Sequence, residues 1–222
     1  MPSEPWLAER AAVCETAREL DRLGLVAGAS GNVSLLIPGD PPLVAITPSR
    51  KSYRSMTAED VPVIDFEYEP VHGDLPPSSE SALHLAVYRA RRDAKAVVHT
   101  HSVYATVCAV SGIEIPPVID EVAVTVGGAV RVTDYAPPGS EELANKAVEA
   151  LEGRSAALIS NHGLVTLGRD LETAMDIAVL VERAAHICIV TRLLGLQRPL
   201  PPEVLAVEEE LFRMRLSVEG NR

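Results

Sequence analysis

The amino-acid sequence predicts one α/β domain over residues 1–222, with a mixed sheet and helices on its faces. A chain of 222 residues with 47% hydrophobic residues can form one well-packed core, or at most two small ones. Segments typical of helices and of strands alternate irregularly along it. No repeat, low-complexity tract or long linker divides it, so a single domain is expected.

The first third predicts a helix and then three strands. Residues 5–24 carry apolar side chains at helical spacing, and Gly24 is a suitable stop. The expected strands are GASGNVSLLI (28–37), LVAITP (43–48) and VPVIDF (61–66). The turn PGDPP (38–42) separates the first two strands.

The middle of the chain predicts a helix, a strand and a second, short helix. PPSSESALHLAVYRARRD (76–93) begins a helix that Ser78 or Ser79 can cap. Leu83, Val87 and Ala90 form its expected buried face. The next elements are a strand over AKAVVHTH (94–101), a short helix over 102–110, and a β-rich segment over 123–135 that a Gly-Gly pair interrupts.

The last third predicts helices around a buried strand. Residues 139–151 form a helix capped by Ser140, with acidic residues in its first turn. SAALISNHG (155–163) is a short strand that ends in turn residues, and LVTLG continues it. A long helix runs from Asp170 to Gly195, and a shorter one lies near 202–215.

Charge and composition narrow the range of partners. A formal net charge of −11 disfavours nucleic acid and anionic membranes, and 4% aromatic residues disfavour a base-stacking surface. A locally positive pocket can still bind a small anion. No apolar run is long enough for a membrane span, and the polar N-terminus leads us to expect no secretory signal. Three widely spaced cysteines indicate reduced thiols in a cytoplasmic protein.

Two histidines follow the apolar run of VVHTH (97–101). In a strand, residues i and i+2 point to the same face, so His99 and His101 can converge on one metal ion. Ordinary strand-end histidines have the same spacing, so the pair alone is weak evidence.

His162 in SNHGLV is the best candidate for a third ligand, because it also ends an apolar strand. A turn histidine with a bonded ring is the alternative. His84 lies one helical turn after Glu80, where it could support the metal ligands or pack in the core. His72 falls in a polar turn, and His186 lies on an expected packing face. Three histidines would leave an open coordination position, as in catalytic zinc sites.

Small and donor-rich residues form three further clusters. Ser78 and Ser79 stand at a helix start, where free backbone N–H groups can bind an anion. A simple N-cap explains one of these serines and leaves the other spare. Glu80 then falls in the first helical turn. There the helix dipole alone can stabilise its carboxylate, or the carboxylate can transfer protons near the metal. SGNVS (30–34) and TPSRKSY (47–53) read as ordinary turns or as further phosphate donors.

The order SGNVS, ITPS, PSSE, HTH and NHG resembles the zinc-dependent class II aldolases of the L-fuculose-1-phosphate aldolase type. That superfamily also holds L-ribulose-5-phosphate 4-epimerase and adducin-like domains. The resemblance runs from RLGLVAGASGNVS (22–34) to the last helix. It implies a central mixed, largely antiparallel sheet flanked by helices, and a homotetramer with active sites at subunit interfaces.

The resemblance also implies roles for residues. His99, His101 and His162 bind Zn²⁺ or another divalent metal, and Glu80 is the catalytic acid/base that can also coordinate the metal. The substrate phosphate is held by Gly31, Asn32, Ser49, Arg50, Ser78 and Ser79. Three departures stand out: Glu121 and Arg215 replace tyrosines expected on the aldehyde side, and Arg50 replaces a usual glycine.

The expected reaction is reversible cleavage of a ketose 1-phosphate to dihydroxyacetone phosphate and an aldehyde. The substrate is L-fuculose 1-phosphate or a related 5-deoxy-pentulose 1-phosphate. A metal with open positions stabilises the charge left when the C3–C4 bond breaks. The alternatives are L-ribulose-5-phosphate 4-epimerase, methylthioribulose-1-phosphate dehydratase and a non-catalytic adducin-like interaction module. An intact histidine triad with Glu80 argues against the last of these.

Overall fold

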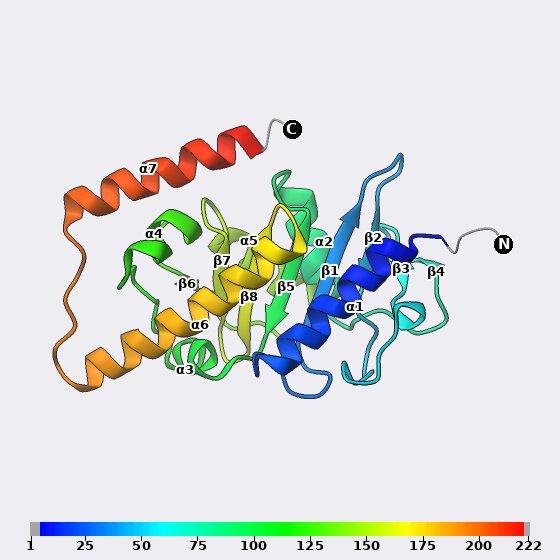
Figure 1. Ribbon diagram of the computed structural model, residues 1–222, viewed down its shortest axis with the longest axis horizontal. Coiled ribbons are helices and arrows are strands. Elements are labelled where there is room, and N and C mark those ends of the chain that lie inside the picture. The colour runs from blue at the N-terminus through cyan, green and yellow to red at the C-terminus, as the bar shows by residue number, and fades with distance from the viewer. Residues whose placement is uncertain (1–4, 220–222) are drawn as a thin grey trace.

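An eight-stranded sheet forms the centre of the computed structural model, which describes residues 5–219 (Figure 1). The strands are β1 (Asn32–Ile37), β2 (Leu43–Ile46), β3 (Val63–Ile64), β4 (Pro70–His72), β5 (Ala96–Thr100), β6 (Arg131–Val132), β7 (Ala156–Ile159) and β8 (Gly163–Gly168). Their order is β4-β3-β2-β1-β5-β8-β7-β6. All neighbours are antiparallel except β6 and β7. The predicted mixed, largely antiparallel sheet is confirmed.

Helices cover both faces of this sheet. They are α1 (Leu7–Arg22), α2 (Ser81–Ala90), α3 (Val103–Ser111), α4 (Asp120–Val126), α5 (Glu141–Ala150), α6 (Leu171–Leu193) and α7 (Pro202–Glu219), with a 3-10 turn at Ala58–Asp60. Figure 1 shows α1 and α6 crossing the near face. Side chains of α1, α3 and α6 share one core cluster, while α2 and α5 share a second with the opposite face of the strands. No helix within residues 5–219 has the length and apolar character needed to span a bilayer.

Several predicted helix ends are confirmed by their capping contacts. The Ser140 side chain accepts a hydrogen bond from the Leu143 N–H, and Asp170 does the same for Thr173. Gly24 and Gly195 follow the last residues of α1 and α6 with φ of 73° and 67°. That left-handed conformation favours glycine, which is why the sequence marks both ends.

The prediction of a β-rich segment over 123–135 is wrong for its first half. Residues Asp120–Val126 form α4, and only Arg131–Val132 join the sheet, as β6. Val122 and Val126 lie one turn apart and are both buried against the core, while Gly127 ends the helix with φ of 94°. Packing of one helical face against the core therefore outweighs the strand preference of valine.

The helix predicted from residue 76 begins five residues later, at Ser81. Neither Ser78 nor Ser79 caps it, because Glu80 occupies the N-cap position. Ser78 donates its backbone N–H to Thr47 O and so belongs to an extended segment beside β2. At the other end, Ala90 is exposed and not part of the buried face.

Two predicted strands are also shorter or divided. The strand expected over 61–66 is reduced to β3, which pairs with the unpredicted β4. LVTLG does not continue the strand before it: β7 and β8 form an antiparallel hairpin. Asn161 turns the chain between them with φ of 56°.

Gly163 is required by the close approach of β8 to β5. A Cβ atom there would lie 2.3 Å from the carbonyl oxygen of Thr100, a backbone atom that cannot swing away. We expect Gly163→Ala to lower the free energy of unfolding by at least about 2 kcal/mol in urea denaturation. Gly112→Ala is the control, because its Cβ would meet open space at φ of 63° and costs only about 1 kcal/mol of backbone strain. Equal losses at both positions would contradict this packing account.

Candidate active site

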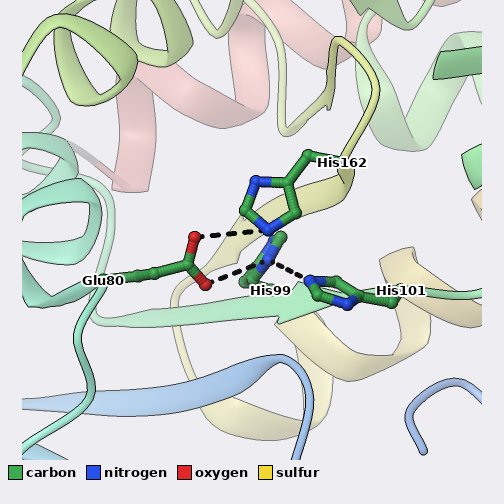
Figure 2. A group of neighbouring side chains, drawn as sticks. All are labelled: Glu80, His99, His101 and His162. Atoms are coloured by element: carbon green, nitrogen blue, oxygen red, sulfur yellow. Dashed lines mark hydrogen bonds and ion pairs between the residues drawn. The ribbon is translucent and has the colours of Figure 1, made fainter. Parts of the chain in front are cut away.

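Three histidines converge where β5 ends beside the turn between β7 and β8 (Figure 2). His99 lies in β5 and His101 directly follows it, so their side chains share one face. His162 comes from the turn, where its N–H bonds to Ile159 O. The ring centroids of each pair of these histidines are 4.8 Å apart. The structure therefore brings together the three predicted metal ligands.

Glu80 completes the cluster from the start of α2. Its Oε2 lies 3.3 Å from His99 Nε2, and its Oε1 lies 3.4 Å from His162 Nε2. One donor atom from each of the four residues lies within 4.8 Å of the others. Glu80 Oε1 is buried and has no hydrogen-bond partner in the described chain, so it is free to accept a proton or a cation.

The imidazoles are held in the form that a metal requires. His99 donates its Nδ1–H to Leu164 O at 2.9 Å, which turns the lone pair on Nε2 toward the cluster. Burial, followed by the neighbouring His101 and His162, holds the pKa of His99 well below its usual value. Burial and His162 lower the pKa of His101 as well. Both rings are therefore neutral at pH 7, as metal ligands must be.

The donor set fits a divalent metal ion. Three imidazole nitrogens and one carboxylate suit a borderline ion such as zinc. Ligands of a tetrahedral ion at about 2.1 Å stand roughly 3.4 Å apart, and Glu80 lies at 3.3 and 3.4 Å from His99 and His162. His99 Nε2 and His101 Nε2, at 2.9 Å, are slightly closer.

A cleft of about 640 Å³ opens onto this cluster. It is bordered by Glu80, His101 and His162, and His99 lies buried beneath them. Every residue predicted to bind phosphate also borders it: Gly31, Asn32, Ser49, Arg50, Ser78 and Ser79. Segments near residues 31, 49 and 79 thus meet at one cavity beside the predicted metal ligands.

Backbone conformation explains two of the cleft residues. A Cβ at Gly31 would lie 2.5 Å from the carbonyl oxygen of His99, so only glycine fits against β5. Arg50 has φ of 62°, a conformation that favours glycine. The arginine therefore carries a backbone strain that the usual glycine avoids, and brings a positive charge to the cleft.

Two of the predicted phosphate donors have other partners. The Asn32 side chain donates to Glu80 Oε2 at 2.9 Å. Ser78 Oγ accepts the backbone N–H of Glu80 at 3.2 Å. Both residues therefore help to hold Glu80, which spacing in the sequence did not reveal. Pro138 and Gly139 also border the cleft and were missed, because nothing local links their loop to the other segments.

The two residues expected on the aldehyde side lie outside this cleft within the chain. Glu121 is on α4, 3.7 Å from Arg183, and both side chains are exposed. Arg215 is on α7 and donates to Val124 O at 3.0 Å. Neither borders the cavity, so their role stays a prediction.

The remaining histidines do not join the cluster. His72 bonds to Arg10, and His84 lies buried behind Asn32. His186 is not buried, but its ring stacks on Tyr104 of α3 with the ring centroids 3.9 Å apart.

Comparisons with known proteins agree with this geometry. Residues 11–189 match the Class II Aldolase and Adducin N-terminal domain. The chain is 34% identical over 212 residues to a 5-deoxy-D-ribulose 1-phosphate aldolase of Bacillus thuringiensis, covering 96% of each protein. It is 39% identical over 180 residues to a 5-methylthioribulose-1-phosphate/5-deoxyribulose-1-phosphate aldolase of Rhodospirillum rubrum, covering 81% of this chain and 80% of that protein.

The chain is also 34% identical to an L-fuculose phosphate aldolase of Escherichia coli, covering 90% of this chain and 92% of that protein. A solved structure of an L-fuculose 1-phosphate aldolase superposes with a TM-score of 0.87 at 33% identity, covering 93% of this chain and 96% of that one. The chain belongs to the class II aldolase and adducin family, and within it to the aldolases, which are aldehyde-lyases.

Binding of a divalent ion to the cluster should stabilise the fold. With zinc at about 100 times its Kd, we expect about 2.7 kcal/mol of added stability, measured as a rise in Tm that a chelator reverses. His162→Ala should lose most of this rise, since it removes one imidazole. His186→Ala is the matched control, because its exposed ring lies outside the cluster. An equal rise in Tm for wild type and His162→Ala would contradict the assigned site.

Proposed function

We propose that the chain reversibly cleaves a 5-deoxy-pentulose 1-phosphate or L-fuculose 1-phosphate into dihydroxyacetone phosphate and an aldehyde. The observation that carries the proposal is the convergence of the His99, His101 and His162 rings and Glu80 on a cleft lined by phosphate-donor residues. Relatives that act on these two kinds of sugar phosphate match the chain over most of its length.

His99, His101 and His162 would hold a zinc ion, with Glu80 as a further ligand. When bound, the ion supplies a Lewis acid that stabilises negative charge on the oxygens of the cleaved sugar. We infer zinc from the three imidazole nitrogens, and another divalent ion is the alternative.

The donor groups of the cleft would bind and orient the phosphate. Ser49 and Ser79 offer hydroxyl groups, and Arg50 offers a guanidinium in an otherwise acidic protein. Binding energy from this non-reacting end of the substrate fixes the sugar chain over the cluster. The buried position of His99 and Glu80 limits water around the reacting carbons.

Glu80 would move the proton that the reaction needs. As the C3–C4 bond breaks, Glu80 Oε1 takes the proton of the C4 hydroxyl, and C4 becomes the aldehyde carbonyl. The electron pair of that bond passes to C3 and the adjoining carbonyl. C3 then takes a proton from Glu80, whose unpartnered Oε1 faces the cluster, and dihydroxyacetone phosphate is released.

Alternative activities on the same scaffold are less well supported. The relatives reported above are aldolases and favour neither an epimerase nor a dehydratase. An adducin-like module without catalysis has no need of the assembled cluster.

We further propose a homotetramer whose active sites lie at subunit interfaces. Apolar side chains remain exposed on the outer helices, among them Val107, Leu193 and Leu211. Glu121 and Arg215 would then approach the aldehyde in a neighbouring subunit's cleft.

We also propose a cytoplasmic location, since all three cysteines are free and buried.

A substrate panel tests the proposed reaction and the role of Glu80. Zinc-loaded wild type should release dihydroxyacetone phosphate from 5-deoxyribulose 1-phosphate or L-fuculose 1-phosphate. Glu80→Gln should lower kcat by about 100-fold or more, because the amide cannot transfer the proton. The bound zinc is measured alongside, to separate lost chemistry from lost metal. No dihydroxyacetone phosphate from any substrate with zinc bound would overturn the proposed function, and full activity of Glu80→Gln would overturn the role of Glu80.

Arg50→Gly separates phosphate binding from backbone strain. We expect KM for the ketose 1-phosphate to rise about tenfold, because a charge-assisted hydrogen bond is lost. We expect stability to rise by about 1 kcal/mol, because glycine adopts the positive φ without strain. Steady-state kinetics and thermal melting measure the two effects. An unchanged KM would remove Arg50 from the phosphate site.

A further inference from the structure

A buried chain of polar side chains leads from Glu80 through Asn32 to the space between β1 and α2. Asn32 Nδ2 donates to Glu80 Oε2 at 2.9 Å, and Asn32 Oδ1 contacts His84 Nε2. His84 Nδ1 lies 2.6 Å from Ser34 Oγ, which lies 2.7 Å from Tyr88 OH. All of these side chains are buried, between β1 and α2.

The chemistry of Glu80 sets the direction of each hydrogen bond. An ionised carboxylate only accepts, so Asn32 must turn its NH₂ group toward Glu80 and its oxygen toward His84. His84 Nε2 must then carry the proton. Burial, followed by the nearby His99, lowers the pKa of His84 to about 3, so the ring is neutral and its Nδ1 accepts from Ser34. Ser34 in turn accepts from Tyr88.

With the hydrogen bonds in these directions, only one of the two carboxylate oxygens of Glu80 has a hydrogen-bond partner. Oε2 is held by Asn32, while Oε1 is buried without a partner and faces His162. The Nε2–H of His84 and the Glu80 carboxylate together hold the Asn32 amide in this orientation. A rotated amide would place its oxygen against the carboxylate and push Glu80 from its position.

We propose that His84 is a positioning residue, which locks the Asn32 amide so that Glu80 keeps Oε1 free for the metal ion and for proton transfer. His84 does not border the cleft, and its Nε2 bonds to Asn32, which in turn bonds to Glu80. The inference rests on the proposed function, because it assigns Glu80 its place in that reaction.

The test compares His84→Phe with His84→Gln in the full-length protein. Phenylalanine fills the ring volume but donates nothing to Asn32, whereas the glutamine amide nitrogen can take the place of Nε2. For His84→Phe we expect zinc Kd, measured by competition with a chromophoric chelator, to weaken about tenfold and kcat to fall about 10- to 100-fold. KM should change less than about threefold, because the phosphate donors Ser49, Arg50 and Ser79 are untouched. His84→Gln should restore Kd and most of kcat.

Thr166→Val is the matched control. Thr166 is equally buried and donates to Ala174 O at 2.7 Å, but it lies on the opposite face of the sheet, toward α6. It should lower Tm without changing Kd or kcat. The inference is overturned if His84→Phe changes Kd and kcat no more than Thr166→Val does, or if His84→Gln is as impaired as His84→Phe.

Ser34→Ala keeps the test decisive if His84→Phe does not fold. It leaves the imidazole in place and removes the hydroxyl that donates to Nδ1 and accepts from Tyr88, so Kd and kcat should shift in the same direction by about threefold. Unchanged values would overturn the inference. A wild type that binds zinc but cleaves no sugar phosphate would overturn the proposed function alone, since zinc Kd still ranks the His84 variants.

Discussion

Antiparallel pairing between β5 and β8 places the proposed metal ligands, and the rest of the site depends on it. In this register Thr100 lies opposite Leu164 and His99 opposite Val165. The carbonyl of Leu164 therefore meets the His99 ring, and the turn that carries His162 comes beside the end of β5. A slip of one residue would turn His99 to the face of α6. Gly163 makes this approach possible, because no side chain separates it from β5.

The other neighbour of β5 positions the carboxylate. Asn32 lies opposite His99 in the pairing of β1 with β5, so the same strand fixes the imidazole and the amide that holds Glu80. Ser34, two residues on, shares this face of the sheet and reaches His84 from α2. The site thus lies where strands β1, β5 and β8 meet helix α2. On its buried side, the polar groups hydrogen-bond to each other. That leaves Glu80 Oε1 and the open side of the cluster for the substrate.

Local spacing in the sequence predicted the parts of the site that depend on local geometry. Alternation along a strand gives the shared face of His99 and His101, and the positions of Glu80 and His162 followed from the motifs around them. Contacts across 48 or 52 residues, such as Asn32 with Glu80 and His84, follow from strand register and could not be predicted from spacing. The same limit applies to the fold: the main sheet strands and long helices were predicted, whereas α4 was not, because tertiary packing decided its conformation. Glu121 and Arg215 lie away from the cleft of their own chain, and their role stays a prediction.

X-ray absorption spectroscopy of the zinc-loaded protein tests the central claim most directly, because it counts imidazole ligands around the ion without relying on activity. The account predicts three imidazole nitrogens at about 2.0–2.1 Å together with oxygen ligands, and no sulfur in the first shell. The same spectrum of His101→Ala should show two imidazoles. A wild-type spectrum with sulfur, or with fewer than three imidazoles, would contradict the claim that His99, His101 and His162 form the metal centre.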